Sequence, residues 1–237
     1  MGSNAKFKRY ELKYIINRQQ YENIFNALTQ HMQKDKYYRS KVCSLYYDTP
    51  DKRLIRRSIE KPVYKEKMRI RSYGVPNGDT KVFVELKKKY KGIVYKRRIE
   101  VPYDIATNYL LGDDSYIKDS QIKREIDYFK AYYAPLEPSM FLSYERIALV
   151  GNEDKALRIT FDTNIMYREY DLSLKSGIYG EKILNDDQVL MEIKIDGGMP
   201  LWLTDILSTN RAYKTSFSKY GTAYGLSCKK ERMKDCG

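Results

Sequence analysis

The feature that most constrains the fold of this chain is a two-residue alternation that recurs along it. Between positions 81 and 89, apolar and mostly charged residues alternate in the run Lys81-Val82-Phe83-Val84-Glu85-Leu86-Lys87-Lys88-Lys89. Successive side chains of a β-strand point to opposite faces, so this spacing predicts a strand with one apolar and one charged face. Nearly every other predicted strand also carries Arg or Lys in its charged register.

The same reading applied to the whole chain predicts an α+β domain. Strands are expected at 7–16, 42–47, 66–73, 81–89, 93–101, 140–150, 157–168 and 189–195. Helices are expected at 17–32, around Leu54 and Ile55, and at 103–111, 120–133, 202–209 and 216–225. The turns between 66 and 101 are short, which favours antiparallel pairing. Residues 1–5 look like a cloning remnant, and no linker divides residues 6–237, so we expect one domain.

The basic faces have two interpretations. An antiparallel sheet with one wet face explains the alternation, but such a face usually mixes neutral polar residues with charges. Like charges opposite one another on neighbouring strands are destabilising, so a row of cations implies an anion that compensates them. The chain carries 44 basic and 31 acidic residues, a formal net charge of +13. We therefore favour a closed barrel with a basic, anion-binding lumen, for which polyphosphate, nucleic acid and anionic lipid are candidate ligands.

Several classes of function are disfavoured by composition. The chain has one histidine, His31, so a His-rich zinc site is excluded and a Ser-His or Cys-His pair would have to use that residue. A metal here should be Mg²⁺ or Mn²⁺ on carboxylates and phosphates. Its three cysteines form no disulfide framework, which is typical of a reducing compartment. No apolar run approaches the roughly 18 residues of a membrane span. We expect a cytoplasmic protein.

The motifs resemble those of a known family. Arg9-Tyr10-Glu11-Leu12-Lys13 is similar to the ExExK element of the triphosphate tunnel metalloenzymes, and closer to the RxExK form of the VTC domain, the polyphosphate polymerase module. The resemblance continues in order through Leu45-Tyr46-Tyr47-Asp48-Thr49, Arg69-Ile70-Arg71, Glu85-Leu86-Lys87-Lys88, Ser143-Tyr144-Glu145-Arg146, Arg158-Ile159-Thr160-Phe161-Asp162, Leu190-Met191-Glu192-Ile193-Lys194 and Ser216-Phe217-Ser218-Lys219-Tyr220-Gly221. It thus spans nearly the whole chain.

The resemblance implies a fold, a reaction and a set of site residues. The implied fold is an eight-stranded antiparallel β-barrel with a basic tunnel and helices packed outside. The implied reaction transfers the γ-phosphate of ATP onto a growing polyphosphate chain with a divalent cation, Mn²⁺ or Mg²⁺. The catalytic cations would be Lys13, Arg69, Arg71, Arg146 and Arg158. Further phosphate contacts would come from Arg57, Lys87, Lys96, Tyr144, Lys194, Ser218 and Lys219, and the metal would be held by Glu192 and Glu11.

One departure from the family pattern bears on the choice between reactions, although alternatives to the polymerase stay open. Arg9 stands where the superfamily's hydrolases and cyclases carry the first Glu of ExExK, which favours the polymerase branch. A tripolyphosphatase or cyclase, and a non-catalytic module for polyphosphate or inositol phosphate, remain the alternatives. Nucleic acid is not expected, because a tunnel that admits a bare phosphate chain excludes a duplex. The chain lacks the membrane helices of larger family members, so coupling to a membrane would need a separate partner.

Overall fold

The computed structural model describes residues 9–91, 93–113 and 115–235, so the expected cloning remnant lies outside the described residues. The chain divides into two compact units that interleave along the sequence. Unit 1 comprises residues 1–40, 144–165 and 184–217, and unit 2 comprises residues 41–143, 166–183 and 218–237. Each unit has its own apolar core. One domain over residues 6–237 stays a prediction.

Ten strands form one sheet in the described part of the chain. Their bounds are β1 (Arg9–Asn17), β2 (Met32–Asp48), β3 (Tyr64–Tyr73), β4 (Lys81–Tyr90), β5 (Ile93–Pro102), β6 (Glu137–Gly151), β7 (Arg158–Arg168), β8 (Glu181–Lys182), β9 (Gln188–Asp196) and β10 (Lys214–Thr215). The bonded order is β10-β1-β9-β7-β6-β2-β3-β4-β5, with β8 beside β7. The two-residue strands β8 and β10 were not predicted. Among the described residues this order begins at β10 and ends at β5, so a closed eight-stranded barrel is not confirmed, whereas the α+β architecture with antiparallel pairing is.

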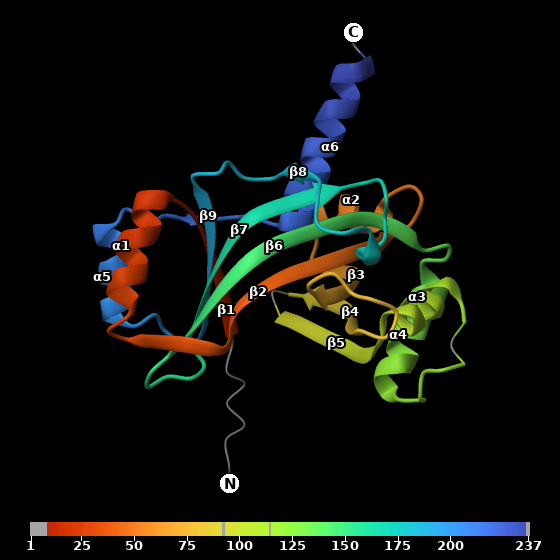
Figure 1. Cartoon of the computed structure of the whole chain (residues 1–237), viewed down its shortest axis with the longest axis horizontal. Coiled ribbons are helices and arrows are strands. Elements are labelled where there is room, and N and C mark those ends of the chain that lie inside the picture. The colour runs from red at the N-terminus through yellow and green to blue at the C-terminus, as the bar shows by residue number, and fades with distance from the viewer. Residues whose placement is uncertain (1–8, 92, 114, 236–237) are drawn as a thin grey trace. The chain divides into compact units, whose positions relative to one another are not determined.

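Six α-helices and one short 3₁₀-helix lie within the described residues. They are α1 (Arg18–Leu28), α2 (Arg53–Ile59), α3 (Tyr103–Leu111), α4 (Gln121–Tyr132), α5 (Leu201–Thr209), α6 (Lys219–Asp235) and η1 (Leu174–Ser176). Figure 1 shows α1 beside α5 in unit 1, and α3 and α4 near β4 and β5 in unit 2. None of the helices described is long and apolar enough to cross a membrane.

The ends of three elements differ most from the sequence prediction. Helix α1 begins as expected, because Asn17 and Gln20 form a reciprocal capping box, but it ends at Leu28 rather than at Met32. Met32 instead begins β2, ten residues before the predicted strand at 42–47. Its first ten residues are mostly polar and exposed, so they lack the apolar alternation that marks a strand. Helix α6 begins at Lys219 and continues to Asp235, past the predicted end at residue 225.

The predicted apolar registers form the two cores. In unit 1, alternate residues of β1 and β9 pack with helices α1 and α5, as for Ile16, Ile24, Met191 and Leu203. In unit 2, the apolar register of β3 and β4 packs with α3 and α4, as for Met68, Ile70, Val82, Val84, Leu86, Tyr109 and Phe129. Each fully buried side chain of this kind contributes about 1.5–3 kcal/mol of transfer free energy. The other register of the same strands is therefore the polar one in each unit.

Candidate functional site

Three predicted cations of unit 2 converge on one carboxylate. Glu85 of β4 is 1% exposed, and its Oε2 accepts hydrogen bonds from Arg69 Nε at 2.9 Å and pairs with Arg69 Nη2 at 2.8 Å. Arg71 Nη2 lies 3.6 Å from the same oxygen, and Lys96 Nζ lies 2.5 Å from Oε1. The Lys96 contact is an ion pair. We call these four residues the Glu85 cluster.

The register of β3, β4 and β5 explains this convergence. Arg69 is the cross-strand partner of Glu85, and Lys96 and Arg71 lie one row away on either side. Burial alone raises the pKa of the Glu85 carboxyl, but the charges of Arg69 and Lys96 outweigh burial and hold that pKa below its ordinary value. Glu85 is therefore ionised at neutral pH and serves as a fixed counter-ion.

The Glu85 cluster has more positive charge than its carboxylate balances. Among the described residues, Glu85 is the only carboxylate in contact with Arg71 or Lys96. Arg71 Nε is moreover buried without a hydrogen-bond partner in the described chain. A buried donor without an acceptor is costly, by about 1–3 kcal/mol. The cluster is therefore suited to an anion with several acceptor oxygens.

A tyrosine pair connects Arg69 to the ends of two helices. Arg69 Nη1 donates to Tyr46 Oη at 2.8 Å, and the Tyr46 ring stacks on Tyr220 of α6 with 4.3 Å between centroids. Tyr220 Oη donates to Asp48 Oδ2 at 3.0 Å, and burial followed by Asp48 raises the pKa of Tyr220. The Asp48 carboxylate also accepts the backbone N–H of Leu54 at the start of α2. The Tyr46 and Asp48 positions of the sequence motif thus orient Arg69.

Lysines occupy the next row of the same face. Lys67, Lys87 and Lys96 are aligned as cross-strand partners on β3, β4 and β5. Lys67 Nζ donates to Ser218 Oγ at 3.3 Å, and this oxygen also accepts the Gly221 N–H at 3.2 Å, so Ser218 caps α6. The predicted phosphate contacts Lys87, Lys96 and Ser218 therefore belong to neighbouring elements of unit 2. Lys219 follows Ser218 as the first residue of α6.

In unit 1 the predicted metal ligands surround Lys13. Lys13 Nζ lies 3.3 Å from Glu11 Oε1 and 3.6 Å from Glu192 Oε1, and it donates to the Phe217 carbonyl at 3.0 Å. Lys13 and Glu192 are cross-strand partners on β1 and β9, and Glu11 is two residues from Lys13 on the same face. The structure therefore brings Lys13, Glu11 and Glu192 together.

Arg146 joins this group from β6. Its Nε and Nη2 donate to the two oxygens of the buried Asp162 at 2.6 and 2.7 Å, and Nη2 also lies 3.3 Å from Glu192 Oε2. Burial disfavours its charge, but the Tyr144 phenol, Asp162 and Glu192 outweigh burial and raise the pKa of Arg146. Its guanidinium also lies 5.0 Å from the Tyr144 ring centre. We define the Glu192 cluster as Glu192, Glu11, Lys13, Arg146 and Asp162.

Arg158 and Lys194 lie one row from Glu192. Lys194 is the cross-strand partner of both Arg158 on β7 and Glu11 on β1. Arg158 is 47% exposed and its Nη2 lies 3.4 Å from Asp35 Oδ2. The row of Arg158 and Lys194 is adjacent to the Glu192 cluster, but the carboxylate that pairs with Arg158 is Asp35, which is not a member of that cluster.

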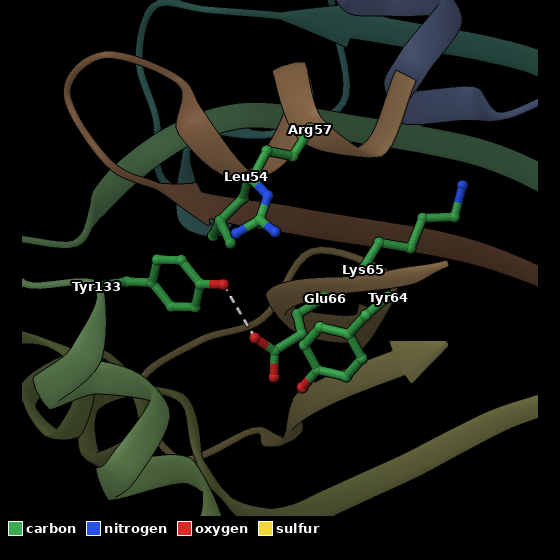
Figure 2. Close-up of a pocket in the computed structure, with 6 residues that line it drawn as sticks. All are labelled: Leu54, Arg57, Tyr64, Lys65, Glu66 and Tyr133. Atoms are coloured by element: carbon green, nitrogen blue, oxygen red, sulfur yellow. Dashed lines mark hydrogen bonds between the residues drawn. The ribbon is translucent and has the colours of Figure 1, made fainter. Parts of the chain in front are cut away.

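Arg57 is not grouped with the other predicted cations. It lines a small pocket with Leu54, Tyr64, Lys65, Glu66 and Tyr133, shown in Figure 2. Tyr133 Oη donates to Glu66 Oε2 at 3.0 Å, and burial followed by Glu66 raises the pKa of Tyr133 to about 12. Glu66 shares its strand face with the core residue Met68, whereas Arg69 points to the opposite face. Because the cavity of about 10 Å³ holds roughly one water molecule, we remove Arg57 from the candidate site.

The metal prediction can be tested against the donors present. No group of three or more His, Cys, Asp or Glu residues in the described chain is placed to hold a metal ion. Mg²⁺ and Mn²⁺ at phosphoryl-transfer sites commonly use one or two carboxylates together with phosphate oxygens and waters. Glu11 and Glu192, which both lie within 3.6 Å of Lys13 Nζ, provide such a pair. The donors therefore fit a metal that binds together with a phosphate ligand.

The sequence analysis missed the carboxylates that position the cations. Glu85 and Asp162 both occur in quoted motifs and in the charged register of their strands, but neither was assigned a role. For Glu85 the available signal was an acidic residue two positions from the basic Lys87 on the same strand face, whereas Asp162 has Thr160 and Asn164 at those positions and gives no such signal. Part of the negative charge that compensates the basic face therefore comes from these two buried residues and not from an external anion.

Comparisons with known proteins agree with the motif pattern. The family model of the VTC domain matches residues 8–227. A solved structure described as a candidate adenylate cyclase from Bacillus halodurans is 12% identical, with a TM-score of 0.55 over 89% of this chain and 95% of that one. Another candidate adenylate cyclase, from Vibrio parahaemolyticus, is 10% identical with a TM-score of 0.47 over 91% and 97% of the two chains. No curated protein matches the chain. The first structure shows a shared fold.

Proposed function

Since the chain belongs to the VTC domain family, we propose that it is a polyphosphate polymerase that uses ATP. In the proposed reaction, a terminal oxygen of polyphosphate attacks the γ-phosphorus of ATP. The bond between that phosphorus and the β–γ bridging oxygen breaks, ADP leaves with the bond's electrons, and the chain grows by one phosphate. The observation that supports a phosphate ligand most directly is the Glu85 cluster, in which three cations share one carboxylate.

The protein's part in this reaction is positioning and charge neutralisation. Phosphoryl transfer needs little covalent chemistry from the enzyme, but it needs aligned groups and compensation of the developing charge. Arg69 and Arg71 can each donate two parallel hydrogen bonds to phosphate oxygens, whereas Lys96 adds a point charge. Glu85 keeps the two arginines on their strand face in the absence of ligand.

The Glu192 cluster is assigned the metal and the reacting phosphate. Glu11 and Glu192 would hold Mn²⁺ or Mg²⁺, and the ion would supply positive charge that offsets the negative charge of the phosphates. Lys13 would then exchange a carboxylate contact for an oxygen of the transferred phosphate. Arg146, fixed by the buried Asp162, would donate to another oxygen of that phosphate. The barrel tunnel implied by the resemblance stays a prediction.

The decisive experiment is incubation of the purified protein with ATP and Mn²⁺. We expect long, acid-labile phosphate chains and one ADP for each phosphate incorporated, measured by gel electrophoresis and by nucleotide chromatography. The control is the protein with Arg124→Ala, because Arg124 pairs with Asp119 on the exposed surface of unit 2, outside both clusters.

Three other outcomes would replace this proposal. Release of orthophosphate from ATP or tripolyphosphate without chain growth would indicate a hydrolase. Formation of cyclic AMP would indicate a cyclase. Tight binding of polyphosphate with no turnover of either substrate would indicate a binding module.

A further inference from the structure

Two buried polar atoms that have no hydrogen-bond partner in the described chain lie on neighbouring strands, and one of them belongs to the Glu85 cluster. Ser44 of β2 is 1% exposed, and its Oγ has no hydrogen-bond partner in the described chain. Arg71 Nε on β3 is also buried and has no hydrogen-bond partner in the described chain. The two residues are cross-strand partners in the β2–β3 ladder, which places their Cβ atoms about 4.5–5.5 Å apart on one face.

The alternation of β2 shows which face this is. Cys43, Leu45 and Tyr47 all belong to the apolar core of unit 2, so Ser44 points to the opposite face. The next residue on that opposite face is Tyr46, whose hydroxyl accepts from Arg69. Ser44 therefore lies on the same face as the Glu85 cluster, although the family motifs gave it no role.

The chemistry of the two atoms indicates which kind of group would satisfy both. Arg71 Nε can only donate, and the Ser44 hydroxyl can donate as well. Two neighbouring donors are satisfied together by an oxygen that accepts twice. A phosphate oxygen does this, and its negative charge would add to that of Glu85, the carboxylate that Arg71 shares with Arg69 and Lys96 in the described chain.

We propose that Ser44 Oγ and Arg71 Nε form a subsite for one oxygen of a linear phosphate chain. This deepens the proposed function, since it rests on the Glu85 cluster's binding a phosphate ligand. Ser44 would favour a phosphate oxygen at this position, because its hydroxyl is a second hydrogen-bond donor beside Arg71 Nε.

The test is calorimetric titration with tripolyphosphate in the absence of nucleotide. Ser44→Ala should weaken binding about tenfold, as expected for a lost hydrogen bond to a charged group. The ligand-free melting temperature should stay unchanged or rise, because the substitution removes a buried hydroxyl that has no partner. A purely structural role would instead lower the melting temperature.

Ser143→Ala is the matched control. Ser143 is also 1% exposed with a hydroxyl that lacks a partner in the described chain. It is two residues from the core residue Phe141, so it shares the apolar face of β6 rather than the basic one. Its substitution should leave tripolyphosphate affinity unchanged. An equal loss in both variants would overturn the subsite, since the effect would then be one of packing.

Arg71→Lys provides the second variant, because it keeps the charge and removes Nε. If both donors bind one oxygen, Ser44→Ala should weaken binding less in the Arg71→Lys background than in the wild type. Equal affinity of wild type and Ser44→Ala would overturn the subsite alone, and would assign the two atoms to a bound water. Absence of tripolyphosphate binding by the wild type would overturn the subsite and the proposed function together.

Discussion

The Glu85 cluster and the Glu192 cluster are built from the same residue types but balance charge in opposite ways. In the Glu85 cluster, one carboxylate is shared by Arg69, Arg71 and Lys96. The Glu192 cluster instead combines the three carboxylates of Glu11, Asp162 and Glu192 with two cations, Lys13 and Arg146. The Glu85 cluster therefore has more cations than carboxylates, whereas the Glu192 cluster has more carboxylates than cations.

The two charge balances suit different ligands. An excess of cations attracts phosphates, whereas an excess of carboxylates attracts a divalent metal ion. At about 4 Å and an effective dielectric constant near 20, each pair of unit charges contributes on the order of 4 kcal/mol before desolvation is subtracted. Much of this attraction offsets the desolvation of buried charges, so a missing partner matters more than the number of pairs.

The largest expected effect separates binding from turnover. Arg69→Ala removes a phosphate donor from the Glu85 cluster, and Arg146→Lys removes the paired donors of the Glu192 cluster while keeping its charge. Both should reduce polymerase activity by about 10²–10³-fold, as for loss of one preorganised donor. Tripolyphosphate affinity should fall mainly in Arg69→Ala, because only that cluster has cations in excess.

Steady-state kinetics and metal-free calorimetry on the same preparations measure the two effects. The comparison of the clusters fails if Arg146→Lys weakens tripolyphosphate binding as much as Arg69→Ala does. Circular dichroism should show both variants folded, since neither position belongs to an apolar core.

An intermediate effect should distinguish the clusters by their metal dependence. Glu192→Gln removes a carboxylate charge from the proposed metal pair, and we expect it to raise the Mn²⁺ concentration for half-maximal activity about tenfold, the lower end for loss of a metal-site partner. The matched change Glu85→Gln should leave that concentration unchanged. Activity titrations against Mn²⁺ at saturating ATP measure both. Equal metal dependence in Glu192→Gln and wild type would assign the metal to other residues.

The sequence was most informative where side-chain alternation was strict. The core register of β4 was predicted correctly, and β3 and β9 show the same alternation, because apolar side chains at every second position have one way to be buried. The same alternation placed Arg69, Arg71 and Lys96 on one face. It could not identify their shared counter-ion, since the contacts to Glu85 depend on the cross-strand register rather than on any local pattern.

The features that the sequence did not predict also depend on contacts between elements. The first half of β2 is polar on both faces, so its strand conformation has no local signal. Arg57 was predicted from the resemblance alone, whereas the orientation of a short helix such as α2 is set by its contacts, which include the Asp48 carboxylate. Ser44 was overlooked because a small polar residue between core positions looks ordinary until its partner strand is known.

The smallest expected effect concerns the pH dependence of stability. The pKa of Glu85 is held below its ordinary value of about 4.3 by Arg69 and Lys96, against the effect of burial. A group whose pKa is lowered by folding stabilises the protein above its ordinary pKa, and this contribution is lost as the pH falls through the folded value. The free energy of unfolding of wild type should therefore decline in this acid range by more than that of Glu85→Gln.

Urea unfolding of both proteins between pH 7 and pH 3 tests this expectation. The difference between their free energies of unfolding should be constant down to about pH 5 and should narrow below about pH 4.3. Glu22→Gln is the control, because the Arg18–Glu22 pair is exposed and such pairs contribute about 0–1 kcal/mol. A difference that stays constant to pH 3 would mean that Glu85 is not the counter-ion of the three cations. The Glu85 cluster could then no longer be described as three cations that share one carboxylate, and its contrast with the Glu192 cluster would not hold.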